Sequence, residues 1–163
     1  MVKTQRLCLR NLREADIPAI YAWRNDPECF RHQRWEDTSE EAVAAYVQEY
    51  ENSAFLSTEE EQHYAVCCDD RIVGELSYFH SEQDRCVTLG ITISPEHQRK
   101  GYAGEILSAV IGAVKESHPA LDMVALIEPE NAPSIALFEG LGFVRECYAE
   151  KIQSYVYVIY GKA

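Results

Sequence analysis

The spacing of hydrophobic residues predicts a strand and two helices in the first third of the chain. Residues 3–10 alternate polar and apolar side chains, which is typical of a strand with one buried face. Asn11, followed three residues later by Glu14, resembles a helix cap, and we expect a helix from there to the turn at 25–27. The capping-box pattern at 38–41 (Thr-Ser-Glu-Glu) precedes apolar residues at helical spacing and predicts a second helix.

From residue 63 onward the period changes to that of strands. Three strands are expected at 63–68, 71–79 and 85–94, with a tight turn at Asp69-Asp70 between the first two, and consecutive antiparallel pairing is the simplest arrangement. An amphipathic helix is expected at 101–116, where apolar residues form one stripe. The mostly apolar segment 122–128 predicts a strand that is covered on both faces.

The chain is expected to close with a short helix and two strands. Asn131 caps the helix, which carries Pro133 in its first turn and ends at Gly142. Strands are expected at 143–149 and 152–160. The apolar end of the last strand could pair across a homodimer or be covered within the monomer, and the sequence leaves both alternatives open.

Length and charge limit the organisation and the partners. The chain has 163 residues, within the roughly 100–200 that one hydrophobic core serves, so residues 1–163 are expected to form a single domain. The 15 Lys and Arg against 27 Asp and Glu give a net charge of −12. Nucleic acid and anionic membranes attract basic surfaces, so neither is expected as a partner. Without a long apolar segment or a secretory signal, we expect a cytoplasmic protein.

The cysteines and histidines do not indicate a metal site. Without an export signal, the six cysteines are expected to be reduced thiols. No Cys-x-x-Cys occurs, and no two of the five histidines have the spacing of a helical metal site. We therefore expect neither a zinc enzyme nor another bound metal.

Residues 91–104 run from an apolar strand through a basic, glycine-containing turn into the amphipathic helix. Such a turn presents unpaired backbone N–H groups and the positive end of a helix, and Arg99 and Lys100 lie beside them. A phosphate-bearing ligand fits this pattern. The turn is neither a nucleotide P-loop nor a dinucleotide fingerprint, because the Gly-Lys-Ser/Thr and Gly-x-Gly-x-x-Gly signatures are missing. An ordinary strand-to-helix connection is the alternative.

Two motifs in this sequence resemble those of a known superfamily. Residues 98–103 (Gln-x-x-Gly-x-Ala) resemble the pyrophosphate loop of the GNAT superfamily of acetyl-CoA-dependent N-acetyltransferases, and residues 131–143 resemble its second motif, Asn-x-x-Ser followed by Leu-Gly-Phe. The opening at 6–10 and the segment 23–27 are similar to the branch that contains ribosomal-protein and spermidine acetyltransferases. The match follows the family's order over nearly the whole chain.

The resemblance implies an α/β (α+β) fold with a mixed, mostly antiparallel sheet of about seven strands and about four helices. It also implies transfer of an acetyl group from acetyl-CoA to a primary amine by direct attack in a ternary complex. Backbone groups of Ile91 and Ile93 would pair with the pantetheine arm, and the amides from Arg99 to Gly104 would hold the pyrophosphate. The implied cofactor-binding residues are Ile91, Thr92, Ile93, Gln98, Arg99, Lys100, Gly101, Tyr102, Ala103, Gly104, Asn131 and Phe138.

Two positions depart from the family's pattern. Many members place a Tyr where Phe138 stands, near the thioester sulfur, and some place a catalytic Glu where Leu126 stands. A thiolate whose pKa is about 8.5 leaves without obligatory help from an acid. Glu128 is the best replacement for the base, since strand period two puts it on the face of Leu126, although a solvated Glu is the alternative. Other polar candidates are Glu75, Thr88 and Tyr157.

An acidic segment bears on the choice of acceptor. Residues 28–61 contain ten acidic and two basic residues, and in the family this helical region covers the acceptor pocket. Such a cover would favour a cationic acceptor, such as a polyamine, an aminoglycoside or a basic peptide terminus, whereas the alternative is a merely solvated surface. A non-catalytic acyl-CoA-binding module that has lost its acid and base is the alternative to an enzyme.

Overall fold

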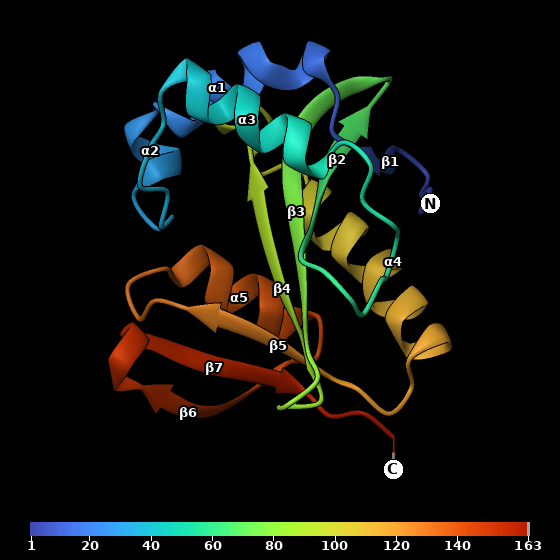
Figure 1. Cartoon of the computed structure of the whole chain (residues 1–163). Helices are drawn as coiled ribbons and strands as arrows, with labels where there is room; N and C mark the ends of the chain where they lie inside the picture. The colour runs from blue at the N-terminus through green and yellow to red at the C-terminus, as the bar shows by residue number, and fades with distance from the viewer. Residues whose placement is uncertain (163) are drawn as a thin grey trace.

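A single seven-stranded sheet organises the computed structural model, which describes residues 1–162 (Figure 1). The sheet order is β1-β2-β3-β4-β5-β7-β6, and every neighbouring pair is antiparallel except β4 and β5. The strands are β1 (Leu7–Asn11), β2 (Gln62–Cys68), β3 (Arg71–Ser81), β4 (Cys86–Ile93), β5 (Asp122–Ile127), β6 (Val144–Ala149) and β7 (Ser154–Ile159). The expected mixed, mostly antiparallel sheet is confirmed.

Within residues 1–162, five helices accompany the sheet, one more than the sequence predicts. The helices are α1 (Ile17–Arg24), α2 (Pro27–Phe30), α3 (Glu40–Tyr50), α4 (Tyr102–Ser117) and α5 (Ala132–Gly140). The additional helix, α2, is a four-residue turn that begins at Pro27, where Asp26 accepts hydrogen bonds from the amides of Glu28 and Cys29. No helix in the described residues is long and apolar enough to cross a membrane.

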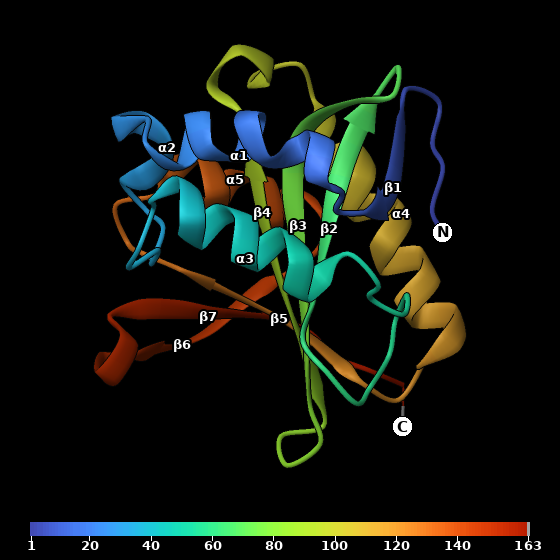
Figure 2. The ribbon, with the colours of Figure 1, turned by 45° about the horizontal axis from the view of Figure 1, so that its top comes forward.

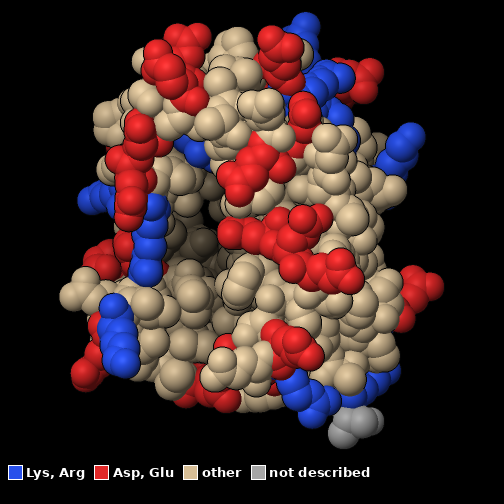
Figure 3. All heavy atoms as spheres, viewed as in Figure 1, with Lys and Arg blue, Asp and Glu red and all other residues tan. Residues whose placement is uncertain are grey.

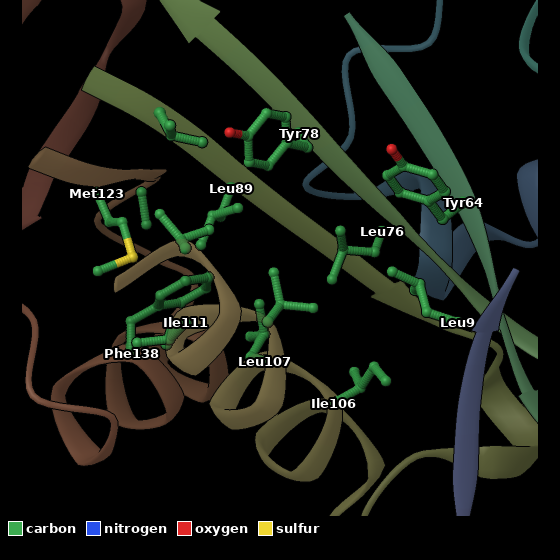
Figure 4. Close-up of a cluster of buried hydrophobic side chains, with 14 of the residues drawn as sticks. Leu9, Tyr64, Leu76, Tyr78, Leu89, Ile106, Leu107, Ile111, Met123 and Phe138 are labelled. Carbon is green, nitrogen blue, oxygen red and sulfur yellow. The ribbon is translucent and has the colours of Figure 1, made fainter. Parts of the chain in front are cut away.

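The helices cover the two faces of the sheet separately, as Figure 2 shows. Strand alternation sends Tyr64 and Leu76 to one face, where α4 and α5 complete the larger core. Figure 4 shows Ile106 and Leu107 of α4 directed at this face. Ala65 and its neighbours on the opposite face pack against α1 and α3 in a second, smaller cluster.

The parallel pair in the centre of the sheet separates after a short contact. Only Cys86–Thr88 of β4 pair with Asp122–Val124 of β5. Beyond them, β4 keeps β3 as its partner and β5 keeps β7. Figure 1 shows β4 and β5 leaving their shared end in different directions. The backbone edges of Leu89–Ile93 and Ala125–Ile127 therefore face a gap between the two strands.

Two local expectations were wrong. Asn11 does not cap a helix but ends β1, and α1 follows a short 3-10 turn (Glu14–Asp16) instead. The strand β5 is not covered on both faces, because Leu126 is 45% exposed on the side away from α4 and α5. Ala125 and Ile127 point to the other face and are buried in the larger core, so the exposure of Leu126 arises because its own face of β5 is not covered.

The last strand is covered within the monomer. Strand β7 lies between β5 and β6 and pairs with both, so its apolar edges are not free to meet a second chain. It begins at Ser154, because a 3-10 turn (Glu150–Ile152) and Gln153, with φ of 49°, intervene after β6. Of the two alternatives that the sequence leaves open for this strand, the structure shows the second.

Candidate active site

The loop between β4 and α4 leaves the start of the helix open to a ligand. Arg99 and Gly101 both have positive φ, 59° and 78°, and this bend turns the chain into α4. Gly101 stands at the N-cap position, and no side chain caps the helix. The first-turn N–H groups of a helix lack intrahelical partners, and the helix dipole makes that end positive. The 16-residue helix α4 therefore presents amides suited to an anion.

Arg6 supports this loop from the other end of the chain. Its Nη1 donates to the carbonyl oxygen of Lys100 at 2.9 Å, and its guanidinium forms an ion pair with Glu105 at 2.7 Å. The guanidinium also lies over the ring of Tyr102, 4.9 Å from its centroid. The hydrogen bond from Thr4, reinforced by Arg6, holds the pKa of Glu105 below its usual value. Sequence reasoning used Arg6 only as part of a resemblance and missed this supporting role.

The predicted cofactor residues are brought to one region of the fold. Gln98 Nε2 donates to the carbonyl oxygen of Ile93 at 3.0 Å, which ties the loop to the end of β4. A Cβ built on Gly104 would lie 3.6 Å from Leu137 Cδ1, so the first turn of α4 lies against α5. Asn131 caps α5, because its Oδ1 accepts from the amide of Ser134 at 3.2 Å. The β4 end, the loop and α5 thus border the same side of the gap.

Phe138 occupies the core rather than the surface of this region. It is 3% exposed, and its ring packs edge-on against Phe143 with centroids 5.1 Å apart. Figure 4 shows it pointing into the cluster that includes Met123 and Ile111. Its position near the sulfur of a bound thioester stays a prediction.

A polar pocket lies on the opposite face of the sheet, beneath α1 and α3. Its volume is about 200 Å³. The lining residues are Arg24, Gln33, Trp35, Tyr46, His63, Glu75, Ser77, Gly90, Ile91 and Thr92. Figure 3 shows a hollow left of centre, with acidic side chains on both sides of it and basic side chains among them on the left. Ile91 and Thr92 belong both to the lining of this pocket and to the part of β4 that no longer pairs with β5.

A buried ion pair forms the inner wall of this pocket. Glu75 of β3, which is 6% exposed, accepts from Arg24 Nη2 at 3.0 Å and from Trp23 Nε1 at 2.7 Å. The Arg24 guanidinium lies 3.9 Å from the ring centroid of Tyr46 and 5.0 Å from that of Trp35. Burial raises the pKa of Tyr46 well above its usual value, so the phenol stays protonated. The pairing of Glu75 leaves it poorly suited to act as a free base.

The other polar candidates are dispersed. The Tyr157 hydroxyl donates to Glu139 of α5 at 3.2 Å, so this side chain lies on the face opposite the pocket. Thr88 lies where β4 and β5 are still paired. Glu128 follows β5 directly, on the face of Leu126, and its Oε2 lies 2.9 Å from His32 Nδ1. Sequence reasoning did not single out His32, since nothing local in the sequence relates it to Glu128.

No metal cluster accompanies these groups. Within residues 1–162, no three His, Cys, Asp or Glu side chains lie together in a way that could hold a metal ion. The six cysteines are all free, and burial raises the pKa of Cys29 to about 11 and that of Cys67 to about 12. In this part of the chain, the side chains of the pocket and of Glu128 are therefore not arranged as metal ligands.

Comparisons with known proteins agree on one family. The profile of the family described as "Acetyltransferase (GNAT) domain" matches residues 6–144. Among named relatives, the uncharacterized N-acetyltransferase YnaD of Bacillus subtilis is 23% identical, with 92% of this chain and 86% of YnaD aligned. YoaA of the same organism, also called an uncharacterized N-acetyltransferase, is 26% identical, with 90% and 84% aligned.

Solved structures show the same fold. A GNAT-family acetyltransferase from Bacillus anthracis superimposes with a TM-score of 0.80 at 21% identity, covering 98% of this chain and 97% of that one. RimL, named as a ribosomal L7/L12 alpha-N-protein acetyltransferase, gives a TM-score of 0.80 at 18% identity, covering 96% and 91%. Another structure of RimL contains coenzyme A.

Proposed function

This chain belongs to the GNAT family of acetyltransferases, and we propose that it transfers an acetyl group from acetyl-CoA to a primary amine that enters from the opposite face of the sheet. One observation carries the proposal: β4 separates from β5 and leads to the uncapped start of α4, and the same separated part of β4 lines a polar pocket on the other face of the sheet. A donor bound at the loop and an acceptor in the pocket would meet in the gap. Direct attack in a ternary complex then needs no covalent enzyme intermediate.

The donor side of the gap fits a coenzyme A thioester. The open amides from Arg99 to Gly104, with the Arg99 and Lys100 side chains beside them, suit a pyrophosphate. Beyond Thr88, the edge of β4 has no strand partner on the β5 side. An extended pantetheine arm can therefore pair with the backbone of Ile91 and Ile93 as an added strand. A backbone amide there would stabilise the oxyanion that forms at the thioester carbonyl.

The acceptor side favours a cationic amine. Acidic side chains lie on both sides of the hollow in Figure 3, and the segment 28–61 that surrounds it carries ten acidic and two basic residues. Such a surface raises the local concentration of a cation and speeds its approach. The protein N-terminus that the name of RimL specifies is one such amine. Polyamines and aminoglycosides are the small-molecule candidates.

Phe138 and Leu126 stand where other family members have an acid and a base. Removal of a proton from the amine is the step for which this chain needs another residue. With Phe138 in the core, the CoA thiolate departs without a tyrosine acid, which its ordinary pKa of about 8.5 allows. The amine must still lose a proton before it attacks. Leu126 cannot take this proton, whereas Glu128 lies two residues further along the same face. Glu128 therefore assists deprotonation, either by taking the proton itself or by orienting the neighbouring group that takes it.

Thiol release from acetyl-CoA tests this function. The purified protein is mixed with acetyl-CoA and, in turn, with polyamines, aminoglycosides, amino acids and peptides with free N-termini. We expect turnover with one class, and acetyl-CoA binding measured by calorimetry whether or not an acceptor is present. Binding without thiol release for every acceptor would instead indicate a non-catalytic acyl-CoA-binding module. Failure to bind acetyl-CoA would contradict the placement of the donor at the loop.

Salt dependence tests the role of the acidic surface. If the acidic side chains attract a cationic acceptor, the apparent KM for that acceptor should rise several-fold between about 0.05 M and 0.5 M NaCl, because salt screens exposed charges. An apparent KM for the acceptor that changes little over this range would mean that the acidic side chains are simply solvated.

A further inference from the structure

The segment between α2 and α3 crosses the open end of the gap and is fastened on both sides of it. Gln33 Nε2 donates to Thr92 Oγ1 of β4 at 3.0 Å. The preceding residue, His32, reaches the other arm of the sheet, where its Nδ1 lies 2.9 Å from Glu128 Oε2. Two consecutive side chains thus attach this segment to the ends of the two separated strands. His32 is thereby held between the ends of β4 and β5, next in sequence to Gln33, which lines the polar pocket.

The contact with Glu128 fixes which nitrogen of His32 is free. An ionised carboxylate can only accept a hydrogen bond, so the proton of the neutral ring lies on Nδ1. The lone pair then lies on Nε2, for which the described residues provide no hydrogen-bond partner. The His32 side chain is 22% exposed, so a ligand in the gap can approach it. The pair has the arrangement of a proton acceptor oriented by a carboxylate.

We propose that His32 Nε2 takes the proton from the acceptor amine, and that Glu128 is a positioning residue that holds the ring through Nδ1–H. This inference rests on the proposed acetyl transfer. Histidine changes charge between pH 5 and 8 more readily than any other side chain, which suits it to exchange a proton near neutrality. The charged group that faces His32 from another element is Glu128, and Arg31 and Arg34 lie on its own segment.

The proton and electron changes balance without a further reactant. His32 Nε2 takes one proton from the bound ammonium group, and the freed nitrogen lone pair forms the N–C bond to the acetyl carbonyl carbon. The tetrahedral intermediate collapses when the C–S bond breaks and its electron pair leaves on sulfur. The remaining excess proton on nitrogen passes to the CoA thiolate. The His32 imidazolium then releases its proton to solvent, so the products are the amide, CoA thiol and one proton.

Substitution by Asn separates the chemical role of His32 from a structural one. The Asn Nδ2 can take the place of His Nδ1 and keep the hydrogen bond to Glu128, whereas nothing replaces Nε2. We expect His32→Asn to lower kcat about 100-fold, to keep wild-type affinity for acetyl-CoA, and to lose the ionisation between pH 5 and 8 from its pH–rate profile. Imidazole should restore part of the activity of His32→Ala. His80→Gln, at the far end of β3, is the matched histidine control and should behave as wild type.

Glu128→Gln should lower kcat less than His32→Asn does and should keep a displaced ionisation of the histidine. If the wild-type protein turns over and His32→Asn is equally active with an unchanged pH–rate profile, this inference is overturned. The proposed acetyl transfer would still stand. Loss of activity in Glu128→Gln but not in His32→Asn would also overturn this inference, because Glu128 would then take the proton itself. If the wild-type protein releases no thiol from acetyl-CoA with any acceptor, the proposed function and this inference are overturned together.

Discussion

Replacement of Glu75 by Gln should lower the free energy of unfolding by about 3–5 kcal/mol, because it leaves Arg24 buried without its counter-charge. The two side chains are 7% and 8% exposed and meet at 3.0 Å. Gln keeps the shape of Glu and an oxygen for Trp23 Nε1, so a large loss would come from the charge rather than from a cavity. Urea unfolding followed by circular dichroism measures the change.

Two further variants test whether the unpaired charge of Arg24 causes this loss of stability. Glu146→Gln removes a carboxylate from β6, where the side chain is exposed, and should change stability by less than about 0.5 kcal/mol. Arg24→Met combined with Glu75→Gln removes both charges and should recover part of the stability that Glu75→Gln loses. If Glu75→Gln alone cost no more than Glu146→Gln, the pair would be solvated in solution and would not form the inner wall of the pocket.

Most elements of the fold could be predicted from periodicity. The strands β2, β3 and β4 begin and end within two residues of their expected bounds, as does α4, because one buried face imposes a regular spacing on each of them. The start of α1 could not be predicted in this way. Asn11 and Glu14 satisfy a cap pattern, but Asn11 pairs with Tyr64 in the sheet, and sheet pairing outweighed the local preference.

The candidate site could be predicted from the sequence only in part, because some of its contacts join residues that are far apart in the chain. The loop at 98–104 is local, so its glycine, its basic residues and the following helix could be recognised together. The inner wall of the pocket joins Arg24 to Glu75, and the proposed proton acceptor joins His32 to Glu128 across 96 positions. Such contacts depend on how β3 and β5 are placed in the sheet, which no local pattern specifies. The exposed Leu126 is similar, since its exposure depends on which face of β5 the helices cover.

Phe138 provides the other large expected effect, and it tests whether this residue serves the core or the cofactor. Phe138→Ala should lower the free energy of unfolding by about 3–5 kcal/mol in the absence of acetyl-CoA, because it removes a ring that is 3% exposed and packed against Phe143. Phe79→Ala, at a ring that is 47% exposed, is the matched control and should cost less than about 1 kcal/mol. Urea unfolding measures both variants.

The same variants measured with acetyl-CoA separate the two roles of Phe138. A ligand that binds only the folded state stabilises it according to its affinity. If the ring also lies near the thioester sulfur, acetyl-CoA should stabilise Phe138→Ala less than it stabilises wild type. If the ring serves only the core, the two increments should be equal. Phe138→Tyr extends the test: a buried hydroxyl without a partner costs about 1–3 kcal/mol, whereas a hydroxyl that reaches the gap would restore the family's acid and raise kcat.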